Sequence, residues 1–274
     1  MAAQSYPPEG VRLKLARAHQ HLEELRSEID TFFESPPFRL ALHTDESGLN
    51  YVLRGYLTHW LPEMVPLIIG DCLQNMRVAL DHLVWALAES TGEEPPHHTS
   101  FPIYLNPDAF HERNRDGRPT ARSGLRRMEA IPDEAQGIVE KLQPYYGDDP
   151  PIHPLWVLNE YSRIDRHRTL SVMYAMSDYT DFDIGRLDSS GTFVPLPRDM
   201  ITNLGMTGGA FYHGTELLRF TLKEFVPNLR VTYDSPQYIH FGQRYISIGN
   251  PLEVLSNIHG HIEHIALPKF EQFF

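Results

Sequence analysis

The chain has 274 residues, of which 41% are hydrophobic and 22% charged, a composition typical of folded globular proteins that excludes global disorder. Its net charge of −12 excludes a protein that is basic over its whole surface, so any role in nucleic-acid binding needs a local basic patch. The single cysteine, Cys72, excludes an intramolecular disulfide framework and a cysteine-rich zinc site. The first ten residues lack a secretory leader pattern, and no apolar run reaches the length of a membrane span. We therefore expect a cytoplasmic protein that does not bind a membrane.

The N-terminal part of the chain has the periodicity of helices. Apolar residues recur every three or four positions over residues 15–32, and a Ser-Pro-Pro sequence at 35–37 ends this pattern. A second and more apolar periodic stretch covers residues 67–89. Shorter helices are predicted at 133–142 and 155–168.

Two parts of the chain have the pattern of antiparallel strands. Residues 38–57 alternate around an Asp-Glu-Ser-Gly turn, which is typical of a hairpin. After Leu170, β-branched or aromatic runs are separated by turn residues. These runs are 171–174, 193–195, 217–222, 229–233 and 238–241. A final helix from Pro251 is predicted to bury one stripe, namely Leu252, Leu255, Ile258, Ile262 and Ile265.

Helices followed by strands and a closing helix predict an α+β fold. We expect a helical bundle of residues 11–35, 63–91, 151–168 and the last helix, with an attached antiparallel sheet in the C-terminal half. We expect three regions of the chain to form one integrated domain. They are a mainly helical region 11–168 with a small hairpin at 38–57 and an arginine-rich loop at 113–127, a strand-rich region 169–250, and a closing helix 251–274 that packs back on the bundle.

Polar residues interrupt the most apolar helix. Asp71, Asn75 and His82 fall near one helical face, while Arg77 and Asp81 are four residues apart and can form an ion pair. Burial of such groups is costly unless they satisfy one another. One interpretation is an internal network that fixes the register of the helix. The other is a site in which His82 performs acid–base chemistry.

A second polar cluster lies at the end of the helix predicted at 155–168. Asn159, Arg163 and His167 follow each other at intervals of four residues, with Arg168 beside them. A helix C-terminus favours cations, so a basic helix end without a ligand is one explanation. If the two helices pack together, the two clusters instead form one anion-binding cleft.

The arginine-rich loop at 113–127 has six arginines and one acidic residue, a local charge of +5. Such a loop can attract a polyanion, although a solvated linker has the same composition. The histidines of the last helix do not have the spacing of a zinc-protease motif, and there is no glycine-rich phosphate loop. We expect neither a metal nor a cofactor.

The helix from Gly70 to Leu83, followed by Asp165-Arg166-His167-Arg168, resembles a family of uncharacterised bacterial proteins. Arg77, four residues and then His82 resemble the R-x4-6-H signature of HEPN domains, which are helical bundles that commonly dimerise and often act as metal-independent endoribonucleases. The resemblance implies that His82 is the base toward a ribose 2′-hydroxyl or the acid toward the leaving oxygen, and that Arg77 steadies the phosphate. Val78 departs from the signature, which often has a polar residue there, and the strand-rich half has no counterpart in a minimal HEPN bundle.

The sequence therefore predicts a HEPN-like metal-independent endoribonuclease or a nucleotide-binding protein, a homodimer whose partner is RNA or a nucleotide. The candidate catalytic residues are His82, Arg77 and Asp81. The candidate substrate-binding residues are Asp71, Asn75, Asn159, Arg163, His167 and Arg168. Two alternatives are a non-catalytic binding or regulatory protein of the defence or toxin–antitoxin type, and a small-molecule hydrolase.

Overall fold

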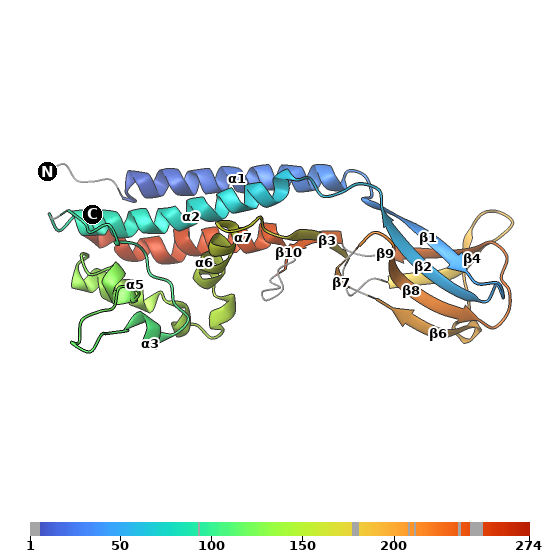
Figure 1. The fold of residues 1–274 in the computed structure, drawn as a ribbon. Helices are drawn as coiled ribbons and strands as arrows, with labels where there is room; N and C mark the ends of the chain where they lie inside the picture. Colours follow the sequence, from blue (N-terminus) through green and yellow to red (C-terminus); the bar gives the residue numbers. More distant parts are fainter. Residues whose placement is uncertain are drawn as a thin grey trace. The chain divides into compact units, whose positions relative to one another are not determined.

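Helices and antiparallel sheets together form a mixed α+β protein, which confirms the predicted class (Figure 1). The computed structural model describes residues 6–92, 94–176, 181–207, 209–210, 212–234, 237–241 and 249–274. The chain forms two compact units, each assembled from segments far apart in the sequence. We call them the helical unit (Met1–Ser27, Glu63–Leu170 and Pro251–Phe274) and the sheet unit (Glu28–Pro62 and Ser171–Asn250).

Long amphipathic helices build the helical unit. They are α1 (Glu9–Phe33), whose last residues belong to the sheet unit, α2 (Met64–Glu89), α6 (Pro154–Asp165) and α7 (Pro251–Gly260). The apolar seam predicted on α1 is buried, with Leu15, Ala18, Leu22 and Leu25 at most 6% exposed. Helix α2 contacts both α6 and α7, so its apolar sides are covered from two directions.

Short helices and turns connect α2 to α6. They are α3 (Pro107–Phe110), α4 (Gly124–Arg127), α5 (Asp133–Lys141) and the 3₁₀ turns η1 (Pro144–Tyr146) and η2 (Pro150–Ile152). Side chains cap the N-terminal ends of three helices of the helical unit. Asn106 and Ser123 accept hydrogen bonds from backbone N–H groups at the beginnings of α3 and α4, and His153 does the same for α6.

The last helix departs from the predicted regular stripe. After α7 the chain winds into a π-helix, η4 (His261–Ala266), and then a 3₁₀ helix, η5 (Leu267–Phe273). The wider winding changes which residues face inward, so Ile265, predicted to be buried, is 49% exposed, while Ala266 is buried. Leu255, Ile258 and Ile262 are buried as predicted.

Every strand pairing in the sheet unit is antiparallel among the described residues. One sheet has the order β1 (Phe38–Thr44), β2 (Asn50–Leu57), β8 (Thr215–Leu222) and β6 (Ile201–Met206). A second consists of β10 (Gln237–Phe241), β3 (Val172–Met176) and β7 (Gly209–Ala210), and a third of β5 (Phe193–Pro195), β4 (Asp181–Leu187) and β9 (Leu229–Asp234). The 3₁₀ turn η3 (Arg198–Met200) precedes β6.

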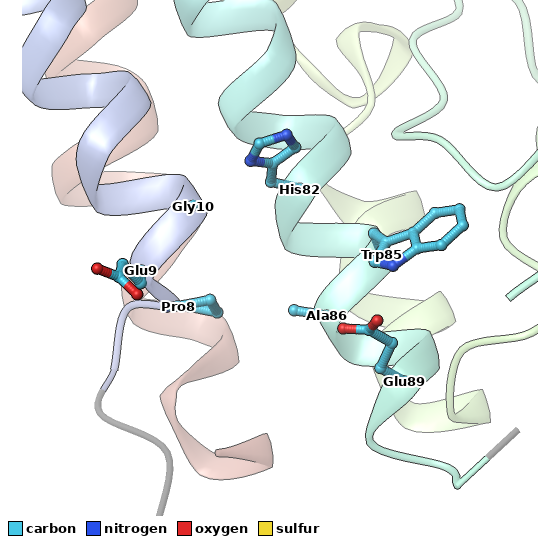
Figure 2. A pocket seen from close by; sticks show the side chains of 7 residues that line it. All are labelled: Pro8, Glu9, Gly10, His82, Trp85, Ala86 and Glu89. Carbon is cyan, nitrogen blue, oxygen red and sulfur yellow. The ribbon is translucent and has the colours of Figure 1, made fainter. Parts of the chain in front are cut away.

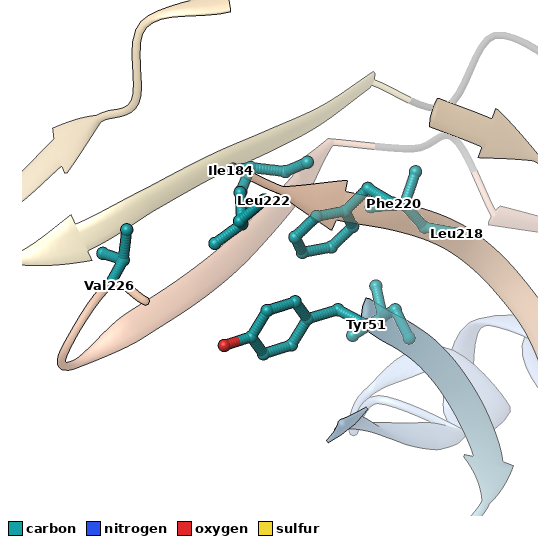
Figure 3. Packing of buried hydrophobic residues seen from close by; sticks show 7 residues of the cluster. Tyr51, Ile184, Leu218, Phe220, Leu222 and Val226 are labelled. Carbon is teal, nitrogen blue, oxygen red and sulfur yellow. The ribbon is translucent and has the colours of Figure 1, made fainter. Parts of the chain in front are cut away.

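Buried apolar side chains from distant strands form the core of the sheet unit (Figure 3). The Tyr51 and Phe220 rings stack with centroids 5.2 Å apart, because β2 and β8 are neighbours in register. Ile184 of β4 packs on the same cluster. A second cluster joins Phe32, at the end of α1, to Tyr174 and Leu217.

The hairpin predicted at 38–57 is present as β1 and β2, and β2 continues the sheet by pairing with β8. The hairpin therefore belongs to the sheet unit, although the sequence assigns it to the helical region 11–168. Its partner strand lies about 160 residues later, and no local pattern encodes such a pairing. Among the described residues, no helix is both long and apolar enough to cross a membrane.

Candidate functional site

One face of α2 packs closely on α6. A Cβ atom on Gly70 would lie 2.8 Å from Cγ of Asp165, so the Asp165 side chain packs directly on the backbone of α2 at this glycine. One turn further along α2, Gln74 donates through Nε2 to the Ser162 carbonyl at 3.0 Å. The same face continues through Arg77, which is therefore directed toward α6 rather than toward solvent.

Arg77 and Asp81 hold the backbone of Phe101. The two side chains form an ion pair at 3.2 Å. Arg77 donates through Nη2 to the Phe101 carbonyl at 2.7 Å, and Oδ1 of Asp81 accepts from the Phe101 N–H at 2.9 Å. Arg77 is only 7% exposed, so this arrangement satisfies part of a buried guanidinium group. It fixes the segment that follows α2 against the helix.

A cavity of about 420 Å³ lies beside this ion pair, and we call it the arginine pocket. It is lined by residues from α2, the segment 100–104, α4 and α6, namely Arg77, Asp81, Ser100, Ile103, Tyr104, Arg127, Asn159, Arg163 and Arg166. The lining thus contains four guanidinium groups and one carboxylate, a net charge of +3. Such a concentration of positive charge is unusual in a chain with a net charge of −12.

The positive charge of the arginine pocket is incompletely neutralised. Burial lowers the pKa of Arg77; Asp81 opposes this effect, while the charges of Arg127 and Arg166 lower the pKa further. The buried Nη1 of Arg77 and Nε of Arg127 have no hydrogen-bond acceptor within the described ranges. An unsatisfied buried donor costs about 1–3 kcal/mol, so the structure holds these guanidinium groups at a cost in stability. Arg163 is partly compensated, since it pairs with Glu160 at 2.7 Å.

The structure brings together four of the residues predicted from the sequence, Arg77, Asp81, Asn159 and Arg163. The other predicted binding residues do not line this cavity, namely Asp71, Asn75, His167 and Arg168. His167 and Arg168 lie beyond the end of α6 and are exposed, because the helix ends at Asp165. Asp71 and Asn75 lie on another face of α2, where Asn75 donates to the Asp71 carbonyl and accepts from Lys14.

His82 lies in a different cavity from Arg77. This second cavity, of about 520 Å³, is lined by Pro8, Glu9, Gly10, His82, Trp85, Ala86 and Glu89. Figure 2 shows the imidazole of His82 pointing from α2 toward the first residues of α1. A Cβ atom on Gly10 would lie 2.6 Å from Nδ1 of His82, so the ring packs closely on the α1 backbone. The predicted Arg/His pair is therefore divided between two cavities of the chain.

Sequence reasoning missed Arg127, Arg166 and Tyr104 as members of the site. Arg127 is part of the arginine-rich loop, and Arg166 follows α6 directly, so both had a compositional signal but no spacing that linked them to Arg77. Neither the composition around Tyr104 nor its spacing from other polar residues indicated that it belongs to the site. It donates through its hydroxyl to the Arg122 carbonyl, which ties the pocket to the arginine-rich loop.

The arginine-rich loop contains an ordered turn. The Asn114 side chain accepts from the N–H groups of Asp116 and Arg118, and Gly117 adopts a φ of +77° that favours glycine. Arg113 donates to the Gly117 carbonyl at 2.8 Å and so stabilises the turn. The turn is exposed on the helical unit and displays its other arginines to solvent.

No group of three or more potential metal ligands is present in the part of the chain that the structure describes. Cys72 is buried, and burial raises the pKa of its thiol to about 12, which is unsuited to a nucleophile at neutral pH. Its Sγ donates weakly to the Ala18 carbonyl. The arginine pocket is thus the best-supported site, and its chemistry is that of anion binding. None of the family models, curated proteins or solved structures compared with this chain matches it.

Proposed function

We propose that the helical unit binds a phosphate-bearing ligand, RNA or a nucleotide, in the arginine pocket. The observation that carries this proposal is the convergence of four arginines from three separate segments on a cavity with one carboxylate. Guanidinium groups bind phosphate oxygens through paired N–H donors, and Arg is preferred over Lys for this task. The proposal agrees with the predicted cytoplasmic location, because RNA and nucleotides are available there.

The arrangement separates a fixed part of the site from an adjustable one. Arg77 is held by Asp81 and the Phe101 carbonyl, so its charge is positioned before a ligand arrives. Arg163 and Arg166 are exposed and can rearrange around a phosphate. Preorganised donors reduce the entropy that binding costs. The half-buried Asn159 adds a neutral amide to the same wall.

The ordered turn of the arginine-rich loop supports a ligand longer than one nucleotide. It is connected to the pocket by the hydrogen bond from Tyr104 to Arg122. Arg115 and Arg118 are exposed there and available to further phosphates, whereas Arg113 stabilises the turn. Replacing both Arg115 and Arg118 by Gln should lower the slope of log affinity against log salt by about 1–1.5, because each contact to a single strand contributes about 0.7.

Binding of fluorescein-labelled single-stranded RNA, followed by anisotropy, tests the proposal. Arg163→Gln and Arg166→Ala each remove an exposed charge from the pocket, so they should weaken binding at least about tenfold without loss of folding. Arg230→Ala, an exposed arginine of β9 in the sheet unit, is the matched control and should bind as the wild type does. Equal affinity for all four proteins would assign RNA binding to another surface.

A second candidate is a metal-independent endoribonuclease of the HEPN type. His82 favours it, because the exposed imidazole lines a cavity and is available for proton transfer. Since Arg77 and His82 line different cavities of one chain, this mechanism needs a homodimer in which His82 of one protomer approaches the phosphate held by the other. RNA cleavage that resists EDTA and disappears in His82→Ala supports it. Binding without cleavage instead favours the non-catalytic regulatory alternative.

A further inference from the structure

We infer that the arginine pocket selects a terminal phosphomonoester over an internal phosphodiester. This inference rests on the proposed function and specifies its ligand: a phosphorylated end of RNA or a free mononucleotide. Three properties of the pocket favour a monoester: its charge, its buried floor with an exposed rim, and its guanidinium donors.

The charge of the pocket matches a dianion. Its lining has a net charge of +3, and Glu160, which pairs with Arg163, lowers the local charge to +2. A phosphomonoester carries about −1.5 to −2 at pH 7, whereas a phosphodiester carries a single negative charge. A diester therefore leaves part of the positive charge uncompensated. The repulsion among Arg77, Arg127 and Arg166, which contributes to the lowered pKa of Arg77, then persists.

The pocket has a buried floor and an exposed rim. Arg77, at 7% exposure, is anchored to the Phe101 backbone and forms the floor. Arg163 and Arg166 are exposed and form the rim. A terminal phosphate enters such a cavity with a single ester link leading outward. An internal phosphate has to bring two chain continuations into a cavity of about 420 Å³ whose walls come from α2, α4, α6 and the segment 100–104.

The donors also favour three free oxygens over two. Nη1 of Arg77 and Nε of Arg127 are buried without an acceptor in the described chain, and Arg166 adds its own fork of donors at the rim. A phosphomonoester offers three non-bridging oxygens, each able to accept more than one hydrogen bond. A diester offers two. The monoester thus offers more acceptors to the guanidinium groups that line the pocket.

Isothermal titration calorimetry with 2′-O-methyl hexanucleotides tests the inference, because these ligands cannot be cleaved through a 2′-hydroxyl. Oligonucleotides of one sequence are compared with a 5′-phosphate, with a 3′-phosphate and with neither. The wild-type protein should bind a phosphorylated form at least about tenfold more tightly than the unphosphorylated form. In Arg166→Ala this preference should fall to within about twofold, and in the control Arg230→Ala it should persist.

The outcomes separate the inference from the proposed function. Equal affinity of the wild type for all hexanucleotides overturns the inference but leaves phosphate binding intact. Binding of none of them, with AMP also failing to bind, overturns both. AMP that binds more tightly than adenosine and as tightly as the phosphorylated hexanucleotide supports a mononucleotide ligand. AMP that binds more tightly than adenosine but more weakly than the hexanucleotide supports a phosphorylated RNA end.

Discussion

Arg77 and His82 are five residues apart on α2, yet they line different cavities. Five residues of α-helix rotate a side chain by about 140°, so the two cannot share a helical face. Arg77 is directed to α6 and is buried, whereas His82 points to the start of α1 and is exposed. Within one chain, the proposed phosphate site and the candidate acid–base residue therefore belong to different cavities.

This separation predicts that His82→Ala leaves phosphate binding intact. The imidazole is exposed and lines only the cavity near α1, so its removal should change neither the RNA affinity by more than about twofold nor the melting temperature by more than about 2 °C. Anisotropy titrations and thermal denaturation followed by circular dichroism measure both. A tenfold loss of affinity in this variant, with Arg166→Ala unaffected, would place the phosphate at His82 instead of in the arginine pocket.

A second prediction concerns the clamp on Phe101. Asp81→Ala removes the acceptor of the Phe101 N–H and leaves the charge of the buried Arg77 uncompensated, so it should lower the free energy of unfolding by about 2–3 kcal/mol. Asp81→Asn keeps an oxygen at the same place and should cost about 1 kcal/mol. Urea denaturation compares the two variants. Equal costs would mean that the charge of Asp81, and not its hydrogen bond, stabilises the fold.

The half-buried pair His153 and His261 predicts a loss of stability in mild acid. Their rings meet edge to face with centroids 4.9 Å apart, and Nε2 of His261 is buried without a partner in the described chain. Burial, together with the nearby His153, lowers the pKa of His261 to about 4, and burial also lowers the pKa of His153. The unfolded chain, with histidine pKa values near 6.5, therefore binds protons before the folded chain does. Above pH 6.5 both histidines are neutral in the folded and the unfolded chain, so the pair does not lower the free energy of unfolding. As the pH decreases from 6.5 toward 4, proton binding by the unfolded chain lowers the free energy of unfolding.

The measurement is urea denaturation at pH 7, 5.5 and 4.5 for the wild type and His261→Phe. Phe keeps an aromatic ring against His153 but cannot be protonated, so the variant should lose less stability between pH 7 and 4.5 than the wild type. His264→Gln removes a histidine whose side chain is 74% exposed and should follow the wild-type pH dependence. Parallel curves for all three proteins would exclude this pair as a source of acid sensitivity.

The sequence predicted the helices well because their signal is local. The apolar seam of α1 and the periodic stretch of α2 can be recognised within one or two turns, and both are buried as expected. Strands β5, β8, β9 and β10 were also recognised, since their residues are β-branched or aromatic. Strands β4, β6 and β7 were missed, because DFDIGRL, ITNLGM and GA contain Asp, Asn or Gly residues, which are typical of turns.

The candidate site was predictable only in part. Arg77, Asp81, Asn159 and Arg163 have helical spacing, so the faces of α2 and α6 on which they lie could be read from the sequence. Arg127 could not be placed, since its position depends on the fold of the segment between α2 and α6. The i, i+5 spacing of the Arg/His signature says nothing about whether both residues face one cavity. That depends on which helices cover each side of α2.

The contact between α2 and α6 gives the last prediction. Gly70→Ala places a methyl group 2.8 Å from Cγ of Asp165, so the carboxyl group has to leave its position beside Gln74, which should lower the free energy of unfolding by about 1–3 kcal/mol. Because α6 contributes Asn159 and Arg163 to the arginine pocket, RNA affinity should fall as well. Gly137→Ala on α5 is the matched control: nothing lies within 4 Å of its added Cβ atom, so it should stabilise the protein by about 0.4–1 kcal/mol and leave affinity unchanged. Urea denaturation and anisotropy distinguish the two variants, and a Gly70→Ala protein as stable as the control would show that the α2–α6 approach can relax without cost.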